Sequence, residues 1–204
     1  MPFDRQLSNS EFVYLRPVAM SDVNDRYVSW LNDPIVNQYL ETRFFEQSVD
    51  SVRQFVIEKT EASNEFLMAI CLLESGLHIG NIKIGPINTW HSRGDLSLFV
   101  GDRTYWGRGV ASLAIKLMIE EGFNHLHLNK ITAGIYRNNI ASQKAFERNG
   151  FLLEGLLKKH FMSEGKDSKD GKHGKDGKED RGEKWQDANL FGLTADHFYE
   201  LLKS

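Results

Sequence analysis

A strand, a glycine-containing loop and a helix follow one another directly between Leu96 and Phe123, and this order constrains the fold more than any other feature. Within the loop, Gly107 and Gly109 flank Arg108, and an amphipathic segment begins at once. The N-terminus of a helix presents unpaired N–H groups and a favourable dipole to an anion. Glycines let the backbone approach that anion closely. The stretch therefore predicts a phosphate-binding turn in an α/β fold.

Two common nucleotide-binding motifs do not fit this turn. The glycine spacing nearly matches the dinucleotide fingerprint, but that motif needs an acidic residue at the end of the next strand, and Lys130–Tyr136 offers none. A Gly-x-x-x-x-Gly-Lys-Ser/Thr loop does not occur in the sequence. The expected ligand carries phosphate but is neither NAD nor ATP.

Length and composition predict one domain over residues 1–204. The chain has 204 residues, 41% of them hydrophobic, and a formal net charge of −3. These values favour a packed domain without a membrane span, and they argue against DNA as a partner. The single cysteine, Cys71, lies in an apolar run, which predicts a core position. With no signal-like start and no disulfide, we expect a cytoplasmic protein.

Alternation, helix period and turn residues predict the order of elements. Strands are expected at Phe12–Arg16, Glu65–Leu73, His78–Ile87, Asp95–Val100, Lys130–Tyr136, Phe151–Met162 and Trp185–Leu193. Helices are expected from Ser21 to Leu31, 48–60, 111–123 and 139–149, with a short helical piece at Ile35–Tyr39 and a helix or coil at Thr194–Leu202. The strands from Glu65 to Val100 should form an antiparallel meander.

Residues 164–184 form a charged insertion between the two closing strands. Glycine, lysine and aspartate recur there, proline is absent, and the charges nearly cancel. This composition favours a long solvated hairpin loop. The functional alternative is a docking arm for an acidic or macromolecular partner.

Three motifs in this order resemble the GNAT superfamily of N-acetyltransferases, in its RimJ/RimL-like branch. The first is Tyr105-Trp-Gly-Arg-Gly-Val-Ala111, similar to the pyrophosphate loop of that family. The second is Asn139-Ile-Ala-Ser142 followed by Ala145-Phe-Glu-Arg-Asn-Gly-Phe151, and the third is Asn32-Asp-Pro34 after the first helix. The resemblance covers nearly all of the chain from Phe12 to Leu193 except the charged insertion.

The resemblance implies an α/β (α+β) fold built on a mixed, mostly antiparallel sheet of about seven strands, with helices on both faces. It also implies a V-shaped gap between the fourth and fifth strands, where acetyl-CoA is held without a metal. The pantetheine arm would contact Leu98, Phe99 and Val100. The diphosphate would lie on Tyr105, Trp106, Gly107, Arg108, Gly109, Val110, Ala111 and Ser112, with Asn139 and Ser142 steadying the far arm.

The chain departs from the family pattern at two positions. Thr104 stands where relatives often have arginine or glutamine, so Arg108 or backbone groups would have to make that phosphate contact. Phe146 stands where many relatives have the tyrosine that protonates the leaving thiolate. Phenylalanine has no proton to give.

Acetyl transfer to an amine needs a base, donors for the developing oxyanion and a proton for the thiolate. The resemblance points to Asp95 as the base, with His91 as an alternative because its pKa is ordinarily near neutral. Tyr136 and Ser142 are the candidates for the acid, and water is a third source of the proton. The amide of Phe99 or Val100 would anchor the carbonyl.

The acceptor would lie on the side walled by the first helix, the loop after it and the late hairpin. The residues nominated there are Tyr39, Glu41, Arg43, Asn81, Lys83, Trp90 and His160. The resemblance favours a small-molecule primary amine, such as an amino sugar on a nucleotide carrier. A protein N-terminus is the alternative acceptor, and a non-catalytic acetyl-CoA-binding module is a third reading. A homodimer is compatible with all three.

Overall fold

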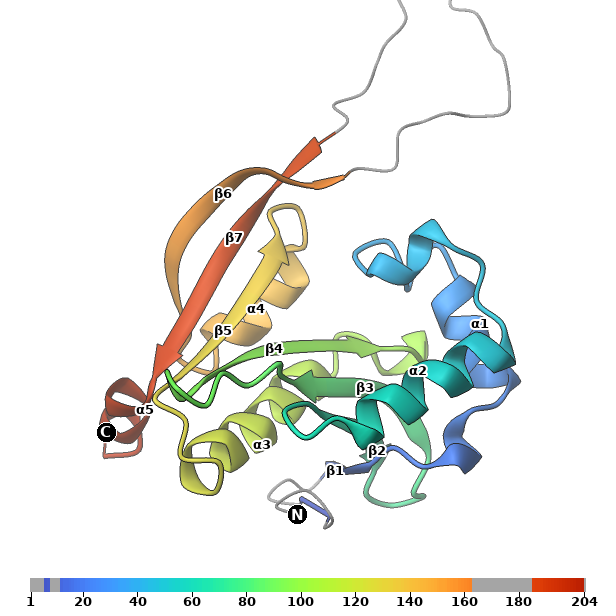
Figure 1. Ribbon diagram of the computed structural model, residues 1–204, viewed down its shortest axis with the longest axis horizontal. Helices are drawn as coiled ribbons and strands as arrows, with labels where there is room; N and C mark the ends of the chain where they lie inside the picture. Colours follow the sequence, from blue (N-terminus) through green and yellow to red (C-terminus); the bar gives the residue numbers. More distant parts are fainter. Residues whose placement is uncertain (1–5, 8–11, 163–184, 204) are drawn as a thin grey trace, which may run out of the picture.

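The computed structural model describes residues 6–7, 12–162 and 185–203 (Figure 1). The predicted charged insertion at 164–184 lies outside the described residues. The strands are β1 (Val13–Pro17), β2 (Phe66–Leu72), β3 (His78–Ile84), β4 (Arg93–Val100), β5 (Lys130–Tyr136), β6 (Leu152–Met162) and β7 (Trp185–Thr194). The helices are α1 (Asp25–Asn32), α2 (Val49–Glu61), α3 (Val110–Asn124), α4 (Ile140–Glu147) and α5 (Ala195–Leu201), with short 3-10 turns η1 (Met20–Asp22), η2 (Glu41–Phe44) and η3 (Arg103–Tyr105).

The strands form one seven-stranded sheet in the order β1-β2-β3-β4-β5-β7-β6. Neighbouring strands from β1 to β4 run antiparallel, as do β5, β7 and β6. The pair β4 and β5 is parallel, and the chain between these strands contains α3. The predicted mixed, mostly antiparallel sheet is confirmed.

Two apolar clusters cover the two faces of the sheet. The larger one packs α3, α4 and α5 against residues such as Ile82, Leu96 and Ile131. The smaller one packs Tyr27 and Trp30 of α1 and residues of α2 against the opposite face of β2. Among the described helices, none combines the length and apolar character that a membrane crossing requires.

The sheet divides where β4 and β5 part. Their pairing covers Arg93↔Lys130, Gly94↔Ile131 and Asp95↔Thr132 and then ends, although both strands continue. Figure 1 shows β5, β6 and β7 rising away from β1 to β4 beyond this contact. The V-shaped gap expected between the fourth and fifth strands is therefore present.

The segment after α1 differs from the prediction. Ile35–Tyr39 forms turns rather than a helical piece, and the 3-10 turn η2 follows at Glu41–Phe44. The Ile35 amide donates to Asp33 Oδ1 at 2.8 Å, and the Asn37 side chain donates to the Leu31 carbonyl at 2.7 Å. These bonds end α1 and turn the chain, so a regular helix cannot continue.

Gly80 allows the end of β4 to pack closely on β3. It lies opposite Val100, and a Cβ at this position would come within 2.4 Å of the Phe99 carbonyl O and 2.9 Å of the Val100 Cα. Both neighbours are backbone atoms of a paired strand, which cannot move aside without disturbing the sheet.

We therefore expect Gly80→Ala to lower the free energy of unfolding by about 1–3 kcal/mol, because the added methyl overpacks a rigid contact. Gly155→Ala is the matched control, since a Cβ at Gly155 meets nothing within 4 Å. Urea unfolding of the two variants measures the difference. Equal stability of both would contradict this account of the strand end.

Candidate active site

The turn between β4 and α3 has the backbone shape that the glycine spacing predicts. Gly107 and Gly109 both adopt positive φ angles, 73° and 79°, and Gly109 caps the N-terminus of α3. A Cβ added to either glycine would meet nothing within 4 Å. The glycines are needed for their conformation, and the space in front of them is open.

The amides from Gly107 to Ser112 point to no acceptor within the described part of the chain. The first α3 amide with a partner is that of Leu113, which donates to the Gly109 carbonyl at 3.0 Å. Arg108 lies at this turn with its guanidinium carbon 5.5 Å from the centre of the Tyr105 ring. The turn thus offers a row of N–H donors, a helix dipole and a cation to an anionic group.

Two side-chain contacts hold the turn in place. The Trp106 indole Nε1–H donates to the Val100 carbonyl O at 2.8 Å, which ties the loop to the end of β4. The Asn149 amide donates to the Ser112 carbonyl O at 3.1 Å and to its Oγ at 3.0 Å. The second contact links the chain after α4 to the first turn of α3.

Alternation along β4 decides which amides face the gap. The amide of Gly101 donates to the Ile79 carbonyl O, and the Gly85 amide donates to the Asp95 carbonyl O. In an antiparallel ladder, odd-numbered residues of β4 therefore turn their N–H and C=O groups toward β3, and even-numbered residues turn them away. The N–H groups of Leu98 and Val100 are directed into the gap.

The expectation for Phe99 is corrected by this register. Its amide faces β3, where its paired residue is Asn81. Its side chain packs with Tyr27 on the α1 side of the sheet, with ring centres 6.2 Å apart. Of the two amides proposed as carbonyl anchor, only that of Val100 is directed into the gap.

The start of α4 lies on the same face of the sheet as α3. Asn139 caps α4, and its Oδ1 accepts the Ser142 amide at 3.1 Å. Phe146 is 2% exposed and packs edge-on against Phe151, with ring centres 4.9 Å apart. Phe146 therefore lies in the core, and its ring supplies no proton.

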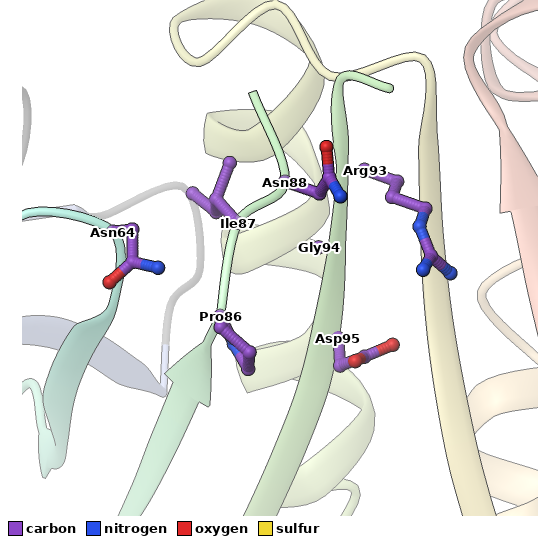
Figure 2. Close-up of a pocket in the computed structure, with 7 residues that line it drawn as sticks. All are labelled: Asn64, Pro86, Ile87, Asn88, Arg93, Gly94 and Asp95. Atoms are coloured by element: carbon purple, nitrogen blue, oxygen red, sulfur yellow. The ribbon is translucent and has the colours of Figure 1, made fainter. Parts of the chain in front are cut away.

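Asp95 lies at the closed end of the gap, on the last paired rung. The Thr132 hydroxyl donates to its Oδ1 across the two strands. Asp95 also lines a pocket of about 280 Å³ (Figure 2). The residues that line this pocket are Asn64, Pro86, Ile87, Asn88, Arg93, Gly94 and Asp95.

His91 lies on the hairpin that precedes β4, at the opposite end of this strand from the glycine turn. Its amide donates to Asn88 Oδ1 at 3.0 Å, and its side chain is exposed. Trp90 next to it is 93% exposed. His91 remains a prediction, but the geometry brings Asp95 and not His91 to the point where the strands part.

On the open side of the gap, η2 reaches across to the ends of β5 and β6. Arg43 donates to the Tyr136 hydroxyl and to the Met162 carbonyl O, both at 2.7 Å. The Tyr136 hydroxyl donates to Glu41 Oε1 at 3.2 Å, and its ring stacks on Phe161 with centres 3.9 Å apart. Burial raises the pKa of Tyr136, against the opposing effect of Arg43, so the phenol keeps its proton at neutral pH.

Other residues nominated for the acceptor wall have partners within the protein. Lys83 pairs with Glu65 at 3.0 Å. Asn81 is 2% exposed, and its Oδ1 lies 2.7 Å from His78 Nε2, beneath the α1 cluster. Sequence reasoning missed Arg93, which lies two residues before Asp95 on the same face of β4. Alternation would have identified it.

The open glycine turn with its unpaired amides, next to two strands that part, suits a phosphate-bearing ligand. Residues 13–152 match the family model described as an acetyltransferase (GNAT) domain. The chain belongs to the GNAT acetyltransferase family. It is an N-acetyltransferase, and acetyl-CoA is its acetyl donor.

Relatives and solved structures agree with this assignment. The uncharacterised N-acetyltransferase p20 of Bacillus licheniformis is 29% identical over 161 residues, 77% of this chain and 88% of the relative. The spermidine N(1)-acetyltransferase of Escherichia coli K12 is 26% identical over 161 residues, 78% of this chain and 83% of the relative.

Two solved structures show the same fold. Mycobacterium smegmatis RimJ in complex with CoA-disulfide has a TM-score of 0.77 at 18% identity, covering 99% of this chain and 95% of that one. Spermidine N-acetyltransferase from Vibrio cholerae, in complex with CoA and spermine, has a TM-score of 0.74 at 19% identity, covering 94% and 99%.

Acetyl-CoA fits the residues present in this GNAT enzyme. The open glycine turn and its unpaired amides suit a diphosphate, and the N–H groups of Leu98 and Val100 suit an amide-bearing arm in the gap. Within the described ranges, no three His, Cys, Asp or Glu side chains gather to hold a metal ion.

We expect Gly109→Val to weaken acetyl-CoA binding by more than about 100-fold, because the side chain would cover several amide donors to a doubly charged group. Gly76→Val is the matched control, since Gly76 has a φ of 70° and lies in the turn between β2 and β3. Both variants suffer similar backbone strain, and calorimetric titration with acetyl-CoA separates strain from binding. Unchanged affinity in Gly109→Val would rule out the turn as the diphosphate site.

Tyr136→Phe should lower the free energy of unfolding by about 1–3 kcal/mol, because it removes the hydroxyl bonded to Arg43 and Glu41. Because the phenol holds η2 on β5, we expect KM for the amine to rise more than kcat falls. Thermal unfolding and steady-state kinetics check both effects. A large fall in kcat with unchanged KM would instead make Tyr136 the proton donor.

Proposed function

We propose that this GNAT enzyme transfers the acetyl group of acetyl-CoA to the primary amine of a small molecule, with Asp95 as the base. The observation that carries the proposal is the position of Asp95 on the last rung before β4 and β5 part, beside a pocket of about 280 Å³. This volume suits a small ligand. Spermidine acetyltransferases among the relatives also act on a small amine.

The diphosphate would lie on the amides of Gly107 to Ser112, with Arg108 beside it. The N–H groups of Leu98 and Val100 would pair with the pantetheine arm, which would carry the thioester along β4 toward Asp95. Bound in this way, acetyl-CoA supplies an activated thioester. Asn139 and Ser142 would steady the far arm of the cosubstrate.

Asp95 would take the proton of the incoming ammonium, directly or through one water, and hold it at its carboxylate. The Thr132 hydroxyl, which donates to Asp95 Oδ1, would keep the carboxylate oriented. Ser142, on the first turn of α4, is the side chain left to protonate the thiolate if Tyr136 serves to hold η2. Water is the other source, because a thiol is acidic enough to leave as the anion.

The class of amine that the enzyme acetylates can be tested by comparing acceptors. An amino sugar on a nucleotide carrier and a protein N-terminus are the two acceptors that the sequence suggested. Initial rates of coenzyme A release with a sugar nucleotide, a free amino sugar, spermidine and a short peptide separate these classes. The cytoplasmic location, expected from the single cysteine, and the homodimer both stay predictions.

We expect Asp95→Asn to lower kcat by about 100-fold or more and to alter the dependence of kcat on pH, because the amide cannot accept the proton. Asp95→Glu should recover part of the rate. Affinity for acetyl-CoA, measured by calorimetry, should remain unchanged in both. A wild-type pH profile in Asp95→Asn would remove Asp95 from the mechanism.

A further inference from the structure

The pocket beside Asp95 contains an arginine without a partner. Arg93 lines this pocket, and no carboxylate or carbonyl of the described residues binds its guanidinium. The other arginine and lysine nominated for acceptor binding, Arg43 and Lys83, are bound within the protein. Of these three side chains, Arg93 is the one whose charged group has no partner among the described residues.

A second cation lies next to Arg93 in the sheet. Arg93 pairs with Lys130 across β4 and β5, and alternation places both side chains on the same face as Asp95 and Thr132. The Lys130 Nζ lies 2.7 Å from Glu154 Oε2. Like charges opposite each other on adjacent strands are unfavourable. Lys130 has a carboxylate partner in Glu154, and a bound anion would balance the charge of Arg93.

The remaining polar groups of the pocket can also donate to an anion. The Asn88 Oδ1 accepts the His91 amide at 3.0 Å, which leaves the Asn88 Nδ2 as a donor. Asn64 closes the opposite wall, with its own carbonyl O taken by the Ile87 amide at 2.8 Å. Figure 2 shows Arg93 and Asp95 extending to the same side of β4, with Asn88 above and Asn64 across.

Two rungs on the same face of the sheet therefore carry opposite charge. Arg93 and Lys130 form one rung, and Asp95 with Thr132 forms the next rung but one along the same face. The two positions on β4 are about 6–7 Å apart along the strand. A ligand with an amine at one end and an anion a few bonds away would satisfy both.

We propose that this pocket binds an anionic group of the acceptor, so that the acceptor is a primary amine carrying a phosphate or a carboxylate. The inference rests on the proposed function, because it takes Asp95 to mark the position of the reacting amine. Arg93 is the residue that selects for the anion. A second ammonium group in the pocket would meet Arg93 and Lys130 and be disfavoured.

The first test measures binding without turnover. The full chain, saturated with coenzyme A, is titrated calorimetrically with glucosamine 6-phosphate and with inorganic phosphate. We expect Arg93→Gln to raise Kd for both by roughly 10- to 100-fold, as for loss of a charged hydrogen bond. Arg93→Lys should keep part of the affinity. Arg53→Gln, a change to an exposed arginine of α2, should have no effect.

The second test compares acceptors of matched skeleton. Glucosamine 6-phosphate is compared with glucosamine, and β-alanine with propylamine. The first pair tests for a phosphate on the acceptor, and the second pair tests for a carboxylate. The anionic member of at least one pair should have the higher kcat/KM, and Arg93→Gln should reduce this preference by roughly 10- to 100-fold. Spermidine and a peptide should be poorer acceptors than the anionic amine.

The outcomes distinguish the pocket from the function on which it rests. If Arg93→Gln leaves both Kd values and the acceptor preference unchanged, or if spermidine is the best acceptor, the anion pocket is refuted. If Arg93→Gln weakens phosphate binding while Asp95→Asn keeps the wild-type pH profile, the pocket stands and the proposed base does not. Loss of coenzyme A affinity in Arg93→Gln and Arg93→Lys alike would show a general structural defect and refute the specific role.

Discussion

The parallel contact between β4 and β5 is the constraint on which the site depends. It joins three residue pairs in the described strands and ends at Asp95 and Thr132. Beyond that rung, each strand keeps its other neighbour, so β4 is held by β3 and β5 by β7. The backbone groups on the inner edges are then left to a ligand, because neither strand can turn to satisfy them.

The two faces of this divided sheet supply different kinds of contact. On the α3 face, backbone amides and a helix N-terminus form the side suited to acetyl-CoA. Side chains such as Trp106 hold the glycine turn against the end of β4. On the α1 face, charged side chains face the closed end of the gap. Arg93 and Asp95 lie there within two residues of each other. In the mechanism we propose, backbone shape binds acetyl-CoA and side-chain charge selects the amine.

Much of the glycine turn and of α3, where acetyl-CoA is expected to bind, could be predicted from local sequence. The predicted helix 111–123 is α3 at Val110–Asn124, and both glycines have the left-handed angles that their spacing suggested. These features depend on a few neighbouring residues, which is why the pattern suffices. The direction of the β4 amides needs the register against β3, and a single strand does not contain that information. Phe99 was misplaced for this reason.

The acceptor side was harder to predict because its contacts join distant segments. Arg43 and Tyr136 are 93 residues apart, and no local period relates them. The turns after α1, closed by Asn37, replaced an expected helical piece for the same reason, since a side-chain bond to Leu31 competes with the backbone pattern. Arg93 was visible to alternation, but its importance appears when the partners of the other cations are known.

The glycine turn has one further consequence. The hydrogen-bond donors of the turn belong to the peptide backbone, so every residue type that tolerates the local angles presents the same N–H group. Most side chains around the loop can therefore change during evolution while the N–H groups suited to acetyl-CoA remain. Only the two left-handed positions are fixed by stereochemistry. A scaffold of this kind can be recruited to new amines by changes elsewhere, while the thioester supply stays the same.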